Sequence, residues 1–239
     1  MSTGIIIAIS VVGGLVLLGG LGFLISKVNR AVSAKTEGWE GRMAEELPRR
    51  GWTYAERDDD LVPFYNQLYQ QHTQPYVLEP FVAPPHAKAA RMVITGVHRG
   101  RPFVAAVFDT LHKGQYTSHR AIWVRTPVAR PALTVQKVVP MASGVNDMIG
   151  TGDVQSGDPD FDARFDVRTK NAQFATAALS PDLVQYLLEG QARLRGFMLI
   201  GDQLEVFDAI SEHRDPRELI PALDLRCDIL DRMPAAVWA

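Results

Sequence analysis

The residues from Gly4 to Ile25 form an unbroken run of 22 residues without a charged side chain, and no other feature limits the fold as much. A hydrocarbon core about 30 Å thick requires roughly 20 apolar residues in a helix that rises about 1.5 Å per residue. The run is apolar on all sides rather than along one stripe, which fits contact with lipid better than one face of a globular core. The sequence therefore predicts a transmembrane helix over residues 1–26.

A cleaved signal peptide is the alternative interpretation of this run. Val32, Ser33 and Ala34 before Lys35 have the small side chains of a cleavage site. However, no basic residue precedes the run, and the run is longer than the usual apolar region of a signal peptide, about 7 to 15 residues. We therefore favour an uncleaved anchor.

The positions of the basic residues predict the orientation of the anchor. Lys27, Arg30 and Lys35 follow the apolar run, and no acidic residue appears before Glu37. By the positive-inside rule the N-terminus lies outside and the rest of the chain is cytoplasmic, so we expect a single-pass protein of the cell membrane. The lone Cys227 agrees, because a secreted domain of this size more often carries paired cysteines. Labelling of a cysteine placed at Lys113 from outside intact cells would contradict this orientation.

Small residues in the apolar run have the spacing of a helix-packing surface. Such residues let two membrane helices approach closely, and the predicted packing positions are Ser10, Gly13, Gly14, Gly20 and Gly22. We expect contact with the lipid bilayer and, through this surface, with another membrane protein or a second copy of the chain. The alternative is that glycine is simply frequent in membrane helices.

The rest of the chain divides into a helical stalk, residues 27–50, and one soluble domain, residues 51–239. Six basic and four acidic residues give the stalk a net charge of +2, whereas 19 basic and 23 acidic residues give the domain −4. An acidic domain neutralises phosphates poorly, which argues against a nucleic acid as a partner.

The domain shows the patterns of an antiparallel sheet with helices. Two apolar stretches flank Arg99-Gly100, and a two-residue turn there sets Thr95 opposite Val104. We expect a central strand at Phe103–Phe108, and strands at 116–126 and 132–139 that continue the meander. A further strand is expected at 161–169 and a hairpin that turns at Gly201-Asp202.

Helix signals complete the fold class. Ser180 and Asp215 are suited to begin helices as N-caps, each with a proline in the first turn. The last helix places Leu219, Leu223 and Cys227 on one apolar face. The predicted class is α+β: an N-terminal transmembrane helix, then one domain with an antiparallel sheet and helices packed on one face.

No motif with the spacing of a catalytic or metal site is present. Asp158, Asp160 and Asp162 resemble the start of a calcium loop, but Ala163 stands where glycine must turn the chain. Three histidines in neighbouring strands (His98, His112 and His119) lack the other ligands of a zinc site. A tight turn after His112 would place His119 opposite Phe108 rather than opposite His112. Cys227 is expected in the core, so the sequence predicts a non-enzymatic protein without cofactor or metal.

Aromatic side chains are concentrated between residues 54 and 81. A ligand or partner surface could be built from Tyr54, Phe64, Tyr65, Tyr69, Tyr76 and Phe81. Packing of a helix on the sheet explains the same residues equally well.

Several segments together resemble a family of actinobacterial single-pass membrane proteins of unknown function. They are "GW-Y-ERDD-L", "VITG-HRGRPFVA", "FD-RF-VR" with "LSP-LV-YLL", and the ending "LDL--DILDRMPAAVW". The resemblance covers most of the chain and implies a tethered α+β domain without known activity. More distantly, the layout is similar to accessory factors of mycolic-acid envelope lipid transport, which also join one span to a cytoplasmic sheet domain.

These observations lead to three functional hypotheses. The first is a membrane-anchored, non-enzymatic adaptor, and the second is a tethered module that binds a lipid or another amphiphile. The third is an enzyme. A deep apolar pocket would favour the second over the first, and a buried cluster of histidine with a carboxylate would favour the third.

Overall fold

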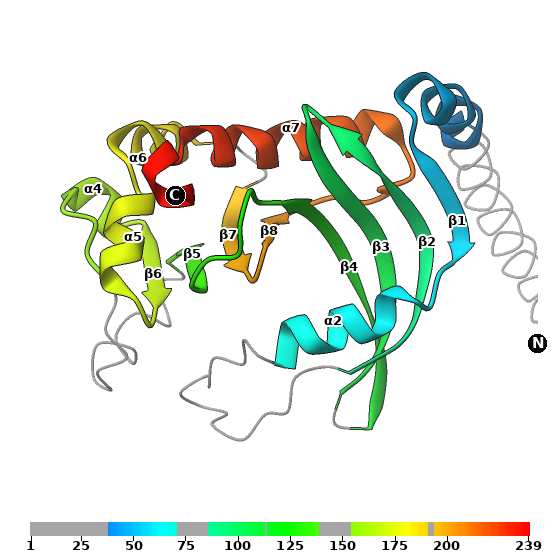
Figure 1. Cartoon of the computed structure of the whole chain (residues 1–239), viewed down its shortest axis with the longest axis horizontal. Coiled ribbons are helices and arrows are strands. Elements are labelled where there is room, and N and C mark those ends of the chain that lie inside the picture. The colour runs from blue at the N-terminus through cyan, green and yellow to red at the C-terminus, as the bar shows by residue number, and fades with distance from the viewer. Residues whose placement is uncertain (1–37, 71–85, 113, 139–153, 191–193) are drawn as a thin grey trace, which may run out of the picture. The chain divides into compact units, whose positions relative to one another are not determined.

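The computed structural model describes residues 38–70, 86–112, 114–138, 154–190 and 194–239 (Figure 1). The predicted transmembrane helix, its five packing residues and residues 27–37 of the stalk lie outside these residues. None of the described helices is both long enough and apolar enough to cross a membrane. Residues 38–50, the end of the predicted stalk, are helical. The chain separates into the units Met1–Glu45 and Glu46–Ala239, and the fold below is that of the second unit.

The described part of this unit contains an antiparallel sheet of eight strands. The strand order is β1-β2-β3-β4-β8-β7-β5-β6. In chain order the strands are β1 (Thr53–Arg57), β2 (His86–His98), β3 (Arg101–His112), β4 (Gln115–Arg125), β5 (Leu133–Lys137), β6 (Phe165–Thr169), β7 (Leu194–Ile200) and β8 (Gln203–Asp208). The antiparallel α+β class is thereby confirmed.

The hairpin of β2 and β3 has the predicted register. Arg99 and Gly100 adopt positive φ angles of 49° and 78°, as a two-residue hairpin turn requires, and Thr95 lies opposite Val104. In the next pair of strands His119 lies opposite Phe108, as expected. The hairpin of β7 and β8 turns at Gly201 and Asp202, also as expected.

The predicted meander was wrong at its end, because β5 does not pair with β4. The chain leaves β4 through a segment with Pro127 and Pro131, which lack the N–H group that a strand donates. β5 pairs with β6 and β7 instead, and β8 occupies the edge of β4. The sheet therefore consists of two four-stranded halves joined by β4 and β8.

The described helices of this unit are α2 (Leu61–Gln70), α4 (Pro159–Asp162), α5 (Ala172–Ala178), α6 (Pro181–Leu188), α7 (Pro216–Arg232) and the short 3-10 helix η1 (Ala235–Trp238). The Ser180 hydroxyl accepts from the Leu183 N–H, and the Asp215 carboxylate accepts from the Arg217 N–H. The two predicted helix starts are confirmed.

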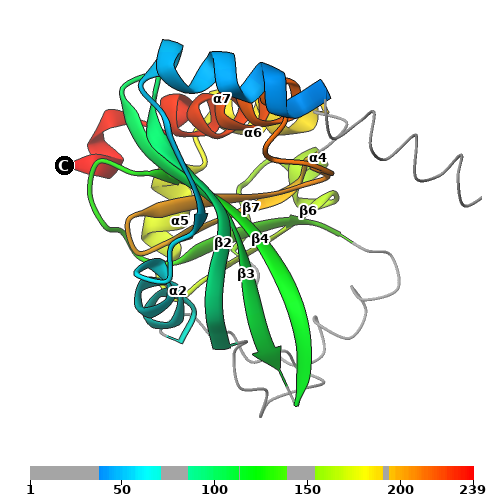
Figure 2. The ribbon, with the colours of Figure 1, turned by 90° about the vertical axis from the view of Figure 1, so that its right-hand side faces the viewer.

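The prediction that helices cover one face of the sheet was wrong. Glu205 of β8 contacts Tyr69 of α2, whereas Asp208 contacts Arg226 of α7. Side chains alternate between the faces of a strand, so α2 and α7 lie on opposite faces. Figures 1 and 2 show α7 near one end of β2, β3 and β4 and α2 nearer the other end. We call the two sides the α2 face and the α7 face.

The predicted strand at 161–169 was also wrong at its start. The strand begins at Phe165, and α4 precedes it. Asp158 is the N-cap of α4, because its carboxylate accepts from the N–H groups of Asp160 and Phe161. The acidic run that resembled a calcium loop is therefore a helix start.

Candidate functional site

The α2 face carries a mixed apolar and polar cluster beneath α2. Tyr65 and Leu68 of α2 pack against the buried Phe108 of β3 and Trp123 of β4. The Tyr65 ring lies 4.4 Å from the Phe108 ring, and the Phe64 ring meets the Trp123 ring edge-on at 5.5 Å. The helix is thus attached by aromatic contacts whose area and geometry stabilise it.

Four polar side chains form a continuous hydrogen-bond network within this cluster. The Tyr65 hydroxyl lies 2.9 Å from Nδ1 of His119, and Nε2 of His119 lies 3.3 Å from Oε1 of Glu205. The Tyr69 hydroxyl donates to the other oxygen of Glu205. The network therefore joins α2 to β4 and β8.

Burial and charge shift the pKa values of this network. Burial, together with the nearby charge of Glu205, raises the pKa of Tyr65 and of Tyr69. Burial acts to raise the pKa of the Glu205 carboxyl as well, but contacts with His119 and Tyr69 outweigh it and leave the pKa below its ordinary value. We conclude that Glu205 is ionised and that both tyrosines are neutral at physiological pH.

The network is closed, because its members use their polar atoms on one another. Both ring nitrogens of His119 and both oxygens of Glu205 have partners within it. A buried cluster of histidine with a carboxylate is the feature that would favour an enzyme, but here only the carboxylate is buried: the side chain of His119 is 36% exposed and that of Glu205 is 6% exposed. The hydrogen bonds of both residues attach α2 to the sheet.

The structure brings together only part of the predicted aromatic surface. Phe64, Tyr65 and Tyr69 lie on α2, where Tyr65 is fully buried. Tyr54 lies on β1, is 38% exposed and donates to Glu56. Tyr76 and Phe81 lie outside the described residues, so a surface formed by all six stays a prediction.

The opposite face of the β4–β8 junction holds a buried ion pair that the sequence analysis did not identify. Pairing between these strands ends at Trp123 and Glu205, and Arg226 of α7 occupies the gap beyond. It donates to the carbonyl oxygens of Ile122 at 2.8 Å and Val206 at 3.2 Å. Its guanidinium also binds both oxygens of Asp208, at 2.8 and 3.1 Å.

One sequence signal could have identified one of these charges. Arg226 lies on the apolar face of α7 beside Cys227. Glu205 gives no such signal, because it stands between Leu204 and Val206 where the alternation of β8 expects a polar residue. A charge at a position that should be buried indicates a paired group. The partner cannot be read from the sequence, because it comes from a distant element.

The remaining predicted positions are structural. Cys227 is fully buried, as expected. His98 of β2 binds Asp224 of α7 at 2.7 Å rather than another histidine. Within the described ranges no three His, Cys, Asp or Glu side chains are grouped to hold a metal ion.

No protein-family model and no curated protein matches this chain. Among solved structures, the chain is similar to the crystal structure of the mycobacterial trehalose monomycolate transport factor A, TtfA. The match has a TM-score of 0.47 and 15% sequence identity, and it covers 82% of this chain and 97% of that chain. A likeness at this level carries no functional argument.

Proposed function

We propose that the protein is a membrane-anchored, non-enzymatic adaptor that serves an envelope process. The uncharged run from Gly4 to Ile25, with basic residues only after it, carries this proposal. The envelope process is proposed from the more distant similarity in layout to accessory factors of mycolic-acid envelope lipid transport, which also join one span to a cytoplasmic sheet domain. In this account the anchor contacts a membrane partner and holds the α+β domain at the cytoplasmic surface.

We place the partner surface of the domain on α2 and the sequence that follows it. From residue 61 to residue 87 the chain has a single Asp, Glu, Lys or Arg, namely Glu79, although such residues make up 22% of the whole sequence. On α2, Pro63 and Gln67 are exposed, and Phe64 and Tyr69 are half-buried beside them. Interface cores are depleted of charge and enriched in aromatic residues, which supports this placement.

Affinity purification from membranes tests the adaptor function. The tagged full-length protein and a version lacking residues 1–30 are purified in mild detergent, and bound protein and lipid are identified by mass spectrometry. We expect a stoichiometric membrane protein with the full-length form only. Recovery of the same lipid and no protein with both forms would contradict the adaptor function.

Cysteine labelling tests the orientation. Tyr116 is 79% exposed, whereas Cys227 is fully buried and gives little background. We expect a Tyr116→Cys variant to resist an impermeant maleimide in intact cells and to react after the membrane is opened. Labelling in intact cells would place the domain outside and overturn the proposed topology.

A further inference from the structure

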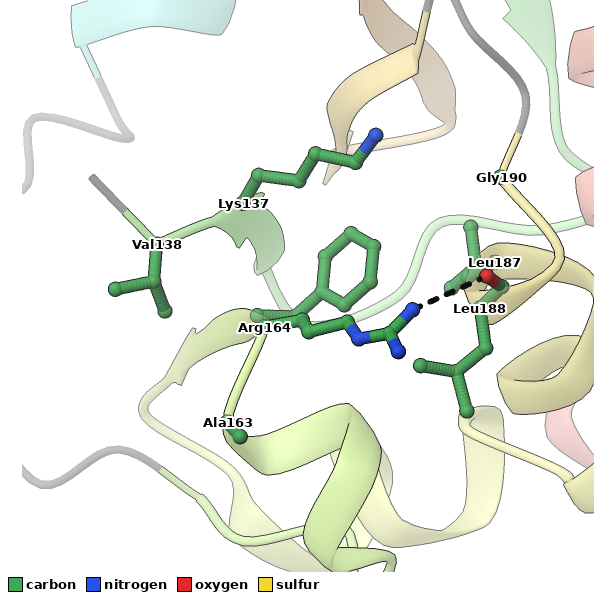
Figure 3. Close-up of a pocket in the computed structure, with 8 residues that line it drawn as sticks. Lys137, Val138, Ala163, Arg164, Leu187, Leu188 and Gly190 are labelled. Carbon is green, nitrogen blue, oxygen red and sulfur yellow. Dashed lines mark hydrogen bonds between the residues drawn. The ribbon is translucent and has the colours of Figure 1, made fainter. Parts of the chain in front are cut away.

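An open hollow of about 570 Å³ lies beside the ends of β5 and α6 (Figure 3). Its volume is within the range of small-molecule pockets, about 300–1,000 Å³. The described residues that line it are Lys137, Val138, Ala163, Arg164, Phe165, Leu187, Leu188 and Gly190. It is far in sequence from α2 and shares no residue with the α2 cluster.

Three element ends create the hollow. The pairing of β5 with β6 ends where Lys137 lies opposite Phe165, and the Val138 N–H then donates to the Arg164 carbonyl at 2.8 Å. Helix α6 ends at Leu188, and Gly190 adopts a φ angle of 77° that turns the chain away. A left-handed turn at this position follows many helix ends.

The rim of the hollow carries two positive charges without acidic partners among the described residues. Within the described ranges no carboxylate forms an ion pair with Lys137, and the one acceptor of the Arg164 guanidinium is the Leu188 carbonyl oxygen, at 3.5 Å. The nearby acids already have partners, because Asp166 binds Arg168 and Glu189 accepts from Gln185. In a domain with a net charge of −4, the rim is therefore locally positive, which favours an anion over a cation.

The walls of the hollow are apolar. Phe165 and Leu187 are buried, and Val138 and Leu188 are half-buried beside them. In Figure 3 the side chains of Lys137 and Arg164 extend toward the side on which Leu187 and Leu188 lie. The two cationic side chains and the alkyl side chains of Leu187 and Leu188 therefore lie along the same hollow (Figure 3).

We propose that this hollow binds a single-chain anionic membrane lipid. A phosphate or carboxylate head group lies between Lys137 and Arg164, and its alkyl chain covers Val138, Phe165 and Leu188. Charge-assisted hydrogen bonds position the head group, and burial of the chain supplies the apolar contribution. The site requires no protein partner, so it goes beyond the proposed adaptor function and does not depend on it.

Native mass spectrometry of the full-length protein in a neutral detergent tests the site. Oleoyl lysophosphatidate is the probe, oleoyl lysophosphatidylcholine is a zwitterionic lipid with the same chain, and inorganic phosphate is the head group alone. The double variant Lys137→Gln/Arg164→Gln removes both rim charges. The variant Lys88→Gln/Lys170→Gln removes two exposed charges elsewhere and is the matched control.

We expect one lysophosphatidate per chain and about tenfold or greater weakening in the rim variant, with the control variant unchanged. The single variant Arg164→Gln should weaken lysophosphatidate binding, whereas Arg164→Lys, which retains the positive charge, should keep most of it. Equal binding of the zwitterionic lipid, or unchanged binding in the rim variant, would overturn the proposal. Displacement by millimolar inorganic phosphate would also overturn it, because the site would then recognise a free anion rather than a lipid.

Discussion

Each face of the β4–β8 junction has a buried charged side chain at its centre, Arg226 on the α7 face and Glu205 on the α2 face, but the two hold different parts of the structure together. On the α7 face, Arg226 uses its five N–H donors on Ile122, Val206 and Asp208 and on a carbonyl of its own helix. On the α2 face, Glu205 accepts from side chains, and one of these belongs to α2. The first charge closes the gap between two strands, and the second fastens a helix to the completed sheet.

This difference predicts separate consequences of losing each charge. The loss of Arg226 leaves two strand carbonyls and a carboxylate unpaired at the connection between the two half-sheets. The loss of the Glu205 charge leaves the sheet intact and weakens the attachment of α2. We therefore expect a global effect on the α7 face and a local effect on the α2 face.

Arg226→Met should cause the largest loss of stability. It leaves the buried Asp208 without its partner, and breaking a buried pair from one side costs about 3–5 kcal/mol. Chemical denaturation measures the free energy of unfolding. The control is Arg217→Met, which removes an exposed guanidinium from the first turn of the same helix, where it pairs with the N-cap Asp215. A loss below about 1 kcal/mol would show that Arg226 does not hold the junction.

Glu205→Gln should cost about 1–3 kcal/mol, because the ionised acceptor of Tyr69 is lost. Hydrogen exchange should accelerate in α2 more than in β3. Since the folded pKa of Glu205 is below its ordinary value of 4.5, its contribution is present above that pH and is lost as the pH falls through the folded pKa. Equal acceleration in both elements would contradict a local role.

His213 should make the stability of the protein depend on pH in a range above that of Glu205. It is fully buried, its Nε2 lies 2.7 Å from the Met92 carbonyl, and burial lowers its pKa below 6.5. The unfolded chain then binds more protons, so stability is full above pH 6.5 and falls as the pH drops toward the folded pKa. The stability difference between the wild type and His213→Gln should shrink between pH 7.5 and about 5.5. If this difference in the free energy of unfolding stayed constant over that pH range, His213 would not be buried as a neutral imidazole in the folded protein.

The exposed pairs at the β2–β3 turn should contribute least. Arg99 binds Asp228 and Asp231 at 2.6 Å, but these side chains are exposed or partly exposed. Arg99→Ala should cost less than about 1 kcal/mol, and added salt should reduce the cost further. A loss as large as that of Arg226→Met would show that charge pairing on α7 matters irrespective of burial.

Local signals predicted much of this fold, whereas distant contacts did not follow from them. The Arg99-Gly100 turn fixed the register of Thr95 with Val104, and Ser180 and Asp215 marked helix starts, because each depends on neighbouring residues. The insertion of β8 beside β4 depends on tertiary pairing. The partners of Glu205 and Arg226 come from elements far along the chain. The sequence could therefore indicate that Arg226 is buried, but it could indicate neither the burial of Glu205 nor the contacts of either charge.

The most direct test of the proposed adaptor function compares how much membrane partner is captured by two variants that each add one negative charge, one on α2 and one on α5. Gln67→Glu places a charge on the exposed side of α2, and Gln173→Glu places the same charge on the exposed side of α5. Each full-length variant is purified from membranes beside the wild type, and the partner is quantified by mass spectrometry. The account predicts that Gln67→Glu loses most of the partner and that Gln173→Glu retains it. Equal recovery with both variants would show that α2 is not the partner surface.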